Sequence, residues 1–404
     1  MSMEAGMPPA PRAAAAGKLR VGVAGLGVAA SQILPAFKDS EAYALVAGAD
    51  NRPAAREAFA SEYGCPTVAS VDELCARDDV DAIWIATPNT LHAEHTVAAA
   101  RAGKHVICEK PMAVTLEECD RMIQAAADNK VVLLQGHSKI YQAPMRIMRD
   151  IVRSGRIGRV LQIQSSNFND WLQRPRLAPE LDTRQGGGIV YRQGPHMVDI
   201  VRFMGGGLVK RVIGVAGKAD PHFDAYGHFS AMLEFVDGAV ATLTFNGYGY
   251  FDVTELTWDI GESGYKQNAA RRFPNGKPRL TGPADPQGKV EGADARKVKP
   301  AEAAKAERFQ PFFGLTVVAG EQGAIRQSPQ GLYVYTEAGR EEIACPPGRG
   351  RDAELRELSA AIAANRPGFP DGRWGKATLE VCLAIMDSAR DGRPREMQFQ
   401  IAAP

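Results

Sequence analysis

The chain has 404 residues, which is enough for two domains with separate hydrophobic cores. Its 48 Lys and Arg residues nearly balance its 47 Asp and Glu residues, so the composition does not support binding to nucleic acid or to an anionic membrane. The six cysteines lack the short paired spacing of zinc sites, and no apolar run approaches the roughly 18 residues that cross a bilayer. We therefore expect a cytoplasmic protein with reduced thiols and no bound metal.

The amino-terminal stretch 1–17 holds Pro, Ala and Gly but no continuous run of large apolar side chains. It cannot serve as the core of a signal peptide, and we expect a disordered tail. The first predicted strand is Leu19–Ala24, and a glycine-rich turn follows it directly, before a helical pattern that continues to Phe37.

That glycine-rich turn has the Gly-x-Gly-x-x-Gly/Ala pattern of dinucleotide-binding loops, with the required strand before it and helix after it. Gly25 permits the tight turn, Gly27 lets a pyrophosphate approach the backbone, and Ala30 lets helix and strand pack closely. The anion is expected at the helix amino terminus, beside Val28 and Ala29, where unpaired N–H groups and the helix dipole favour negative charge.

The next predicted strand, Ala44–Ala49, ends in Asp50, about 20 residues beyond the glycines. A carboxylate there accepts hydrogen bonds from the adenosine ribose of NAD and repels the 2′-phosphate of NADP. Arg52, beside Asn51, could pair with that phosphate and keeps NADP open. The alternative is that the glycines form only a turn and that Asp50 only caps the helix beginning near Pro53. The order of strand, glycines, helix, strand and acid favours a cofactor site.

Two further predicted strands end in polar loops. Val80–Ala86 is a near-continuous apolar run, typical of a parallel strand covered on both faces, and the loop Thr87–His92 follows it. Val106–Cys108 leads into Glu109-Lys110-Pro111, which suits a sheet interior badly because charges are expensive to bury and proline donates no ladder hydrogen bond. Ligands bind at the carboxyl ends of parallel strands, so we interpret Lys110 as the catalytic amine.

Helices alternate with these strands. A helical pattern covers Ala93–Arg101, and a capping box at Thr115-Leu-Glu-Glu118 opens a helix that runs to about Asn129. The strand Val131–Leu134 follows. This alternation predicts a doubly wound parallel sheet, which we assign to a Rossmann domain over 18–138.

The second half, 139–404, is predicted to be a substrate-binding α/β domain. Gln142–Ser154 reads as an amphipathic helix, and Val160–Asn167 begins a large sheet. Further strands are expected at 212–217, 231–235, 240–245, 256–260 and 331–335. Two amphipathic helices are expected near the carboxyl terminus, at Asp352–Ala363 and Gly375–Ala389.

The loop 169–188 is dense in Arg, Pro and Gly. Arg174, Arg176 and Arg184 in this loop, with Arg192 shortly after it, could form a fork for carboxylates. The alternative is that most of them are solvated surface arginines.

With Gly25-Leu-Gly27, Thr87-Pro-Asn-Thr-Leu-His92 and Glu109-Lys-Pro111 in this order, the chain resembles the Gfo/Idh/MocA oxidoreductases. The resemblance continues through Ser154-Gly-Arg-Ile-Gly158, Gly186-Gly-Gly188 and His196. It implies an amino-terminal Rossmann domain, a carboxyl-terminal α/β domain with a large open, mostly antiparallel sheet, an NAD(P) cofactor, and homodimers or homotetramers.

The same resemblance implies roles for individual residues. Lys110 matches the catalytic lysine, His196 matches the histidine that ends the second motif, and cofactor contacts are implied for Thr87, Pro88, Asn89, His92, Glu109, Lys110 and Pro111. The family often has an aspartate four residues before this histidine, whereas this chain has Arg192, which argues against an Asp–His polyol-binding pair. The loop is similar to that of the branch containing phthalate 4,5-cis-dihydrodiol dehydrogenase. This similarity implies a site that binds a substrate with a carboxylated ring. The residues implied for that site are Asp170, Trp171, Arg174, Arg176, Arg184, Arg192 and His196.

The segment 268–308 is rich in Lys, Arg and Pro and poor in large apolar residues. It cannot bury enough surface to order itself, so we expect a flexible basic insertion.

These features favour an NAD(P)-dependent dehydrogenase that acts on a cyclic, carboxylated secondary alcohol such as an aromatic cis-dihydrodiol. Lys110 would take the hydroxyl proton as the hydride leaves, and His196 would hydrogen-bond the same hydroxyl, relay the proton or orient the substrate. Two alternatives remain open, a sugar or cyclitol dehydrogenase and a non-catalytic NAD-binding sensor.

Overall fold

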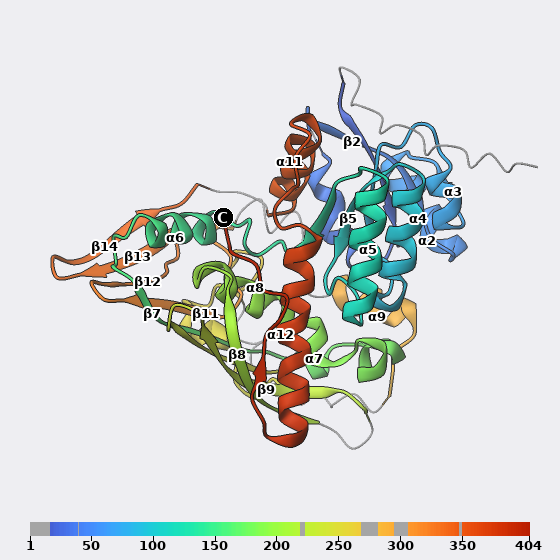
Figure 1. Ribbon diagram of the computed structural model, residues 1–404. Helices are drawn as coiled ribbons and strands as arrows, with labels where there is room; N and C mark the ends of the chain where they lie inside the picture. The colour runs from blue at the N-terminus through green and yellow to red at the C-terminus, as the bar shows by residue number, and fades with distance from the viewer. Residues whose placement is uncertain (1–16, 39, 219–222, 268–281, 295–305, 347–349) are drawn as a thin grey trace, which may run out of the picture. The chain divides into compact units, whose positions relative to one another are not determined.

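The computed structural model describes residues 17–38, 40–218, 223–267, 282–294, 306–346 and 350–404. The chain forms two compact units, one from residues 1–136 and 351–376 and the other from residues 137–350 and 377–404 (Figure 1). The expected tail 1–17 lies, apart from its last residue, outside the described residues.

The first unit is built on a six-stranded parallel sheet with the order β3-β2-β1-β4-β5-β6. Strands β4 and β5 are buried at every residue, as expected for parallel strands covered on both faces. The strand order reverses between β1 and β4, and ligands bind at the carboxyl ends of strands at such a point. The strands are β1 (Leu19–Ala24), β2 (Tyr43–Ala49), β3 (Thr67–Val68), β4 (Ala82–Ile85), β5 (His105–Glu109) and β6 (Leu133–Gly136).

Helices follow the strands of this unit, and α4 and α5 lie side by side (Figure 1). The capping box at Thr115 and Glu118 is confirmed, with both reciprocal hydrogen bonds formed. The first helix is shorter than predicted, because α1 gives way after one turn to a 3₁₀ helix, Leu34–Ala36, with a proline in its first turn. The helices are α1 (Ala30–Ile33), α2 (Pro53–Tyr63), α3 (Val71–Cys75), α4 (His92–Arg101) and α5 (Leu116–Asp128).

The segment Arg351–Lys376 also belongs to the first unit, although we expected all of 139–404 in the second domain. It contains most of α11 (Gly350–Ala363) and the start of α12 (Gly372–Asp391). Leu355 and Leu358 of α11 are fully buried in the core cluster of the first unit. The apolar periodicity predicted these helices, but periodicity does not identify the core against which a helix packs.

The second unit is built on a nine-stranded sheet with the order β14-β13-β12-β11-β7-β10-β9-β8-β15. The pair β7–β10 is parallel and the other neighbouring pairs are antiparallel, so the predicted open, mostly antiparallel sheet is confirmed. The strands are β7 (Val160–Phe168), β8 (Val209–Lys218), β9 (Tyr226–Phe235), β10 (Val240–Asn246), β11 (Leu315–Gly320), β12 (Ala324–Gln327), β13 (Gly331–Thr336), β14 (Gly339–Ala344) and β15 (Arg395–Glu396).

The strand predicted at 256–260 is wrong. Val253–Leu256 forms a 3₁₀ helix, and Ile260 makes only an isolated bridge with Lys266. The backbone cannot be extended between them, because Trp258 and Asp259 have φ values of 53° and 69°.

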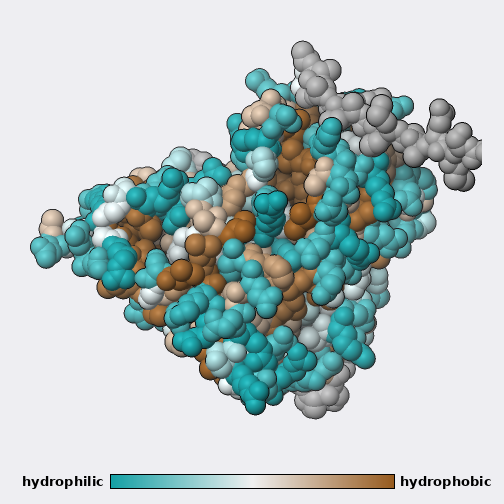
Figure 2. All heavy atoms as spheres, viewed as in Figure 1, coloured by the Kyte–Doolittle hydropathy of each residue, from teal (hydrophilic) through white to brown (hydrophobic). Residues whose placement is uncertain are grey.

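Helices α6 (Ala143–Arg153), α7 (Gly188–Arg192) and α8 (Gly194–Met204) belong to the second unit, and α8 packs on β7 and β10. The carboxyl-terminal part of α12 lies against β8, where a side chain at Gly214 would come within 3.0 Å of Ile385. Among the described residues, the exposed large apolar side chains all belong to this unit, for example Val215 at 68% exposure. Apolar residues also reach the surface in Figure 2. The homodimer or homotetramer remains a prediction.

The basic segment 268–308 is only partly described, because 268–281 and 295–305 lie outside the described residues. The part between them is more ordered than we expected. It contains helix α9 (Pro286–Asp294), and the Lys289 ammonium lies 2.9 Å from the Glu180 carboxylate. We predicted a flexible segment because 268–308 contains few apolar residues. The described part is instead held by the ion pair between Lys289 and Glu180.

Within the described residues, no helix is both long and apolar enough to cross a membrane. The same residues contain no group of three or more His, Cys, Asp and Glu side chains that could hold a metal ion.

Candidate active site

The turn after β1 has the shape that a bound dinucleotide requires. Gly25 has a φ of 88°, and a Cβ there would lie 2.7 Å from the carbonyl oxygen of Ala86 and 2.8 Å from the amide nitrogen of Thr87. A Cβ at Gly27 would meet nothing within 4 Å. The backbone at Gly27 is therefore open, and the predicted roles of these two glycines fit the structure.

Asp50 follows β2 and its carboxylate is held from two sides. One oxygen accepts the backbone N–H of Leu26 at 2.9 Å, and the guanidinium of Arg52 spans both oxygens at 2.9 Å each. Burial alone would raise the pKa of Asp50, but the hydrogen bonds from Arg52 and Leu26 lower it below its usual value. Asp50 is thus an ionised acceptor beside the glycine turn, as a ribose-binding carboxylate must be.

The pairing with Asp50 also limits Arg52, which we considered as a partner for the 2′-phosphate of NADP. The guanidinium of Arg52 already pairs with the carboxylate of Asp50. This carboxylate neutralises the positive charge that would attract a phosphate. The fit to NAD is therefore better than the fit to NADP. Asn51, between them, is exposed.

His92 connects the two loops that follow β4 and β5. Its ring nitrogens lie 2.8 Å from the carbonyl oxygen of Pro111 and 3.0 Å from the carbonyl oxygen of Thr87. Both partners only accept hydrogen bonds, so the ring makes both bonds when each nitrogen carries a proton. His92 is 1% exposed. His92 therefore holds the two loops together, and its cofactor contact remains a prediction.

The other residues of the first loop are held in place locally. The Thr87 hydroxyl lies 3.0 Å from Nδ1 of His95, and Pro88 precedes a short 3₁₀ helix, Asn89–Leu91. Asn89 is buried at 6% exposure. The loop is therefore a fixed part of the sheet edge.

Glu109, Lys110 and Pro111 stand at the carboxyl end of β5, as predicted. The Lys110–Pro111 peptide bond is cis, and Lys110 is half-buried. Glu109 is 4% exposed and its carboxylate lies 2.7 Å from the guanidinium of Arg351. The predicted cofactor contact of Glu109 therefore does not fit its side chain, which faces an interior cation.

In the second unit, His196 lies on α8 and is 7% exposed. Its ring packs edge-on against Phe313, with 4.9 Å between ring centroids. The ammonium of Lys139 lies 4.9 Å from the same Phe313 ring and 2.8 Å from the carboxylate of Glu262. His196 is thus held by an aromatic contact close to a cation that the sequence did not reveal.

A buried carboxylate, Glu180, organises the arginine-rich loop. Arg192 lies 2.8 Å from it, Lys289 2.9 Å and Arg176 3.7 Å, and the amide of Leu177 donates to it at 2.9 Å. Burial would raise the pKa of Glu180, but these three cations lower it to about 2. We call Glu180, Arg176, Arg192 and Lys289 the cation cluster; its own side chains carry more positive than negative charge.

The other residues predicted to contact the substrate either lie outside the cation cluster or are buried. Trp171 is 0% exposed, and the guanidinium of Arg176 stacks 4.1 Å above its ring, so Trp171 supports the cluster rather than contacting a ligand. Arg174 pairs with Asp170 at 2.8 Å.

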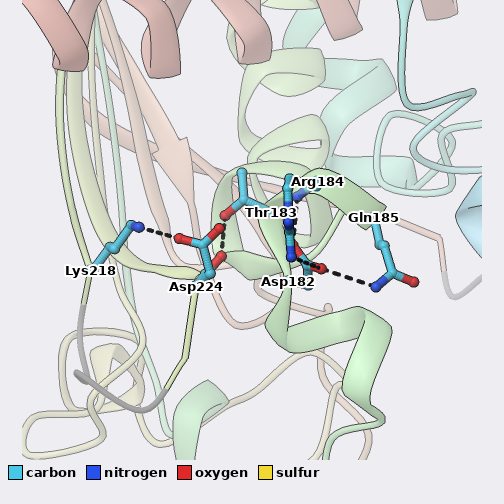
Figure 3. A network of polar contacts seen from close by, with 6 residues as sticks. All are labelled: Asp182, Thr183, Arg184, Gln185, Lys218 and Asp224. Atoms are coloured by element: carbon cyan, nitrogen blue, oxygen red, sulfur yellow. Dashed lines mark hydrogen bonds and ion pairs between the residues drawn. The ribbon is translucent and has the colours of Figure 1, made fainter.

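Arg184 belongs to a different, exposed network (Figure 3). Its guanidinium pairs with Asp182 at 3.1 Å and its side chain is 81% exposed. The hydroxyl of neighbouring Thr183 donates to the backbone carbonyl oxygen of Asp224, and the carboxylate of Asp224 pairs with Lys218. This network ties the loop to the segment after β8, which matches the solvated-surface alternative.

Sequence reasoning missed several charged residues. Glu180 and Lys289 complete the cation cluster, Arg351 faces Glu109, and buried His137 lies 3.8 Å from Asp199 on α8. Asp199, three positions after His196, was a detectable signal because an acid inside a mostly apolar helix needs a partner. Lys289 and Arg351 had no comparable signal, because each is distant in sequence from its partner.

Comparisons with known proteins agree with this arrangement. Residues 19–137 match the oxidoreductase family model described as an NAD-binding Rossmann fold, and residues 145–259 match the GFO/IDH/MocA C-terminal domain. The chain is 33% identical over 380 residues to a 1-carboxy-3-chloro-3,4-dihydroxycyclohexa-1,5-diene dehydrogenase of Comamonas testosteroni, covering 92% of this chain and 95% of the relative.

Two further proteins with similar sequences are also described as dehydrogenases. The chain is 32% identical to an inositol 2-dehydrogenase of Rhizobium meliloti, over 50% of this chain and 63% of the relative. A protein from Bordetella bronchiseptica RB50, described with its crystal structure as a candidate dehydrogenase, is 37% identical, with a TM-score of 0.84 over 94% of this chain and all of that one. The chain therefore belongs to the Gfo/Idh/MocA family of NAD-binding oxidoreductases.

Proposed function

We propose that this enzyme oxidises a secondary alcohol of a carboxylated cyclic diol, such as an aromatic cis-dihydrodiol, with Lys110 as the general base. The observation that carries the proposal is the cation cluster, because its Arg192 occupies the position four residues before His196. An arginine there favours a carboxylate on the substrate over an uncharged polyol. The near full-length similarity to a dehydrogenase of a carboxylated cyclohexadiene diol supports the same substrate class.

The proposed reaction needs one proton acceptor and one hydride acceptor. NAD, when bound, supplies the hydride acceptor, and Gly25, Gly27 and Asp50 would hold it. Lys110 removes the proton from the hydroxyl oxygen while the carbinol carbon gives up its hydrogen with two electrons, leaving a carbonyl group. In the reverse direction the Lys110 ammonium returns the proton to the oxygen. His196 is proposed to hydrogen-bond the same hydroxyl.

Arg192 is the preferred partner for the substrate carboxylate. Arg174 pairs with the carboxylate of Asp170, and Arg184 pairs with the carboxylate of Asp182. Glu180, in contrast, faces three cations, so one carboxylate does not neutralise the cluster. The three positive charges of the cluster would attract an incoming carboxylate.

A substrate panel tests the proposal. The purified enzyme with NAD should be offered carboxylated cis-dihydrodiols, the same dihydrodiols without the carboxylate, myo-inositol and glucose, with NADH absorbance as the readout. We expect the highest kcat/KM for the carboxylated dihydrodiols. Equal or better turnover of inositol or glucose would overturn the proposal in favour of a sugar or cyclitol dehydrogenase. Tight NAD binding without turnover of any compound would instead favour a sensor.

A further inference from the structure

Arg351 connects α11 to the strand that carries Lys110. Its guanidinium lies 2.7 Å from the carboxylate of Glu109 and 3.1 Å from the carboxylate of Glu354. It also lies 5.5 Å from the ring centroid of Trp84 in β4. All four residues belong to the first unit. A cation that is distant in sequence thus pairs with Glu109, the residue before Lys110.

This ion pair is well shielded from water. The Arg351 side chain is 12% exposed and that of Glu109 is 6% exposed. Glu354 is completely buried. Burial would lower the pKa of Arg351, but the two carboxylates raise it above its ordinary value. Arg351 therefore keeps its charge, and charges in such surroundings interact more strongly than charges in water.

Glu109 is close to the backbone of the proposed base. One of its carboxylate oxygens lies 3.4 Å from the amide nitrogen of Lys110. An unneutralised carboxylate at this position would stabilise the ammonium form of Lys110, whereas a base that accepts a proton near neutral pH needs the opposite.

We propose that Arg351 is a positioning residue for catalysis, which offsets the negative charge of Glu109 and thereby favours the uncharged amine form of Lys110. The inference rests on the proposed role of Lys110 as the base. The elements around this edge carry further titratable and charged groups. They are His92, Glu94, His95 and Arg101 on α4, Glu117, Glu118, Cys119, Asp120, Arg121 and Asp128 on α5, Asp352, Glu354, Arg356 and Glu357 on α11, and Arg373 and Lys376 at the start of α12. A purely structural role, in which Arg351 only pins α11 to the sheet, would leave the titration of Lys110 unchanged.

The test measures the titration of Lys110 directly. Competitive labelling with isotopic acetic anhydride over a pH series, read by mass spectrometry of the Lys110 peptide, reports the pKa of that amine without turnover. We expect Arg351→Gln to raise this pKa by about one unit. Glu109→Gln should lower it, because Arg351 then lacks its partner. Arg351→Lys should largely restore the wild-type value.

A matched control is Arg356→Gln, on the same helix, where the arginine pairs with Asp352 and its side chain is 70% exposed. It should leave the Lys110 titration unchanged. The proposal is overturned if folded Arg351→Gln and Glu109→Gln enzymes both titrate like the wild type, or if Arg356→Gln produces the same shift. If Arg351→Gln fails to fold, Glu109→Gln decides the question alone.

The pH profile of kcat separates this inference from the proposed function. If Lys110 is the base, the acid limb of the oxidation profile should move to higher pH in Arg351→Gln, together with the labelling result. If labelling shifts but the acid limb does not, the electrostatic link holds while the assignment of Lys110 as the base fails.

Discussion

Arg192 and Glu180 form an ion pair of 2.8 Å, which links the last residue of α7 to a 3₁₀ helix, Ala178–Leu181, in the preceding loop. The pair is unequal, because the carboxylate is 4% exposed while the arginine is 25% exposed. Glu180 can therefore hold Arg192 from behind while part of the guanidinium remains accessible to a ligand.

The first prediction concerns this arginine. Arg192→Gln should reduce kcat/KM for carboxylated dihydrodiols by roughly 10- to 100-fold, because a charge-assisted hydrogen bond is lost. It should have little effect on the same diols without a carboxylate. Arg184→Gln, at the exposed arginine of Figure 3, is the control and should affect neither substrate. Equal losses on both substrate types would show that Arg192 does not recognise the carboxylate.

The second prediction concerns the stability that Glu180 provides. Its pKa in the folded protein, about 2, lies below the ordinary 4.5, so its contribution is complete above pH 4.5 and is lost as the pH falls toward 2. Glu180→Gln should lower the free energy of unfolding by about 3 kcal/mol at pH 7. Urea denaturation of both proteins from pH 7 to pH 3.5 should show this difference shrinking below pH 4.5. A difference independent of pH would contradict the electrostatic account.

The third prediction tests the base. Lys110→Met should reduce kcat by about 10²- to 10⁴-fold, since it removes the group that accepts the proton. The dissociation constant for NADH, measured by fluorescence, should change little because the glycine turn and Asp50 are untouched. Lys110→Arg should be equally inactive, as arginine keeps the charge but does not give up its proton near neutral pH. Substantial turnover in either variant would remove Lys110 from the mechanism.

The fourth prediction concerns the choice of cofactor. Asp50→Ser should release Arg52 from its fork and make it available to a 2′-phosphate. The ratio of kcat/KM with NADP to that with NAD should rise by roughly 100-fold. Asp50→Ser/Arg52→Ala should lose this gain on the NADP side. If the single and double variants have the same ratio, Arg52 does not bind the phosphate.

The fifth prediction tests the packing of α11 in the first unit. Leu358 is fully buried in that core, so Leu358→Ala should lower the free energy of unfolding by about 2–5 kcal/mol. Val215→Ala, at an exposed position in β8, should change it by less than about 0.5 kcal/mol. Chemical denaturation measures both. A small effect at Leu358 would mean that α11 contributes little to the core.

The predictions made from sequence agree with the structure where the backbone conformation depends on neighbouring residues. The glycine turn, the acid after β2 and the Glu-Lys-Pro stretch after β5 are local patterns, in which a few positions determine backbone shape and strand ends. Their placement at the carboxyl edge of one sheet follows from strand alternation alone. Family resemblance added the expected role of Lys110, which remains a prediction.

The sequence was less informative where a charge acts through a distant partner. Glu109 was predicted to contact the cofactor, yet its carboxylate faces Arg351 in the interior. Glu180 looked like one more charged residue in a polar loop, although three cations meet there. Composition shows how many charges a segment carries but not which of them become buried together, because that depends on long-range packing.

The first unit is formed by two separate stretches of the chain, which limits how the enzyme can be divided into fragments. A gene fragment ending near residue 138 would encode all six strands of the parallel sheet but would omit Leu355 and Leu358, leaving bare the apolar surface that they cover. Chimaeras that exchange the substrate half of one relative for another should therefore keep 351–376 with its own nucleotide-binding portion, which requires three junctions in the coding sequence instead of one.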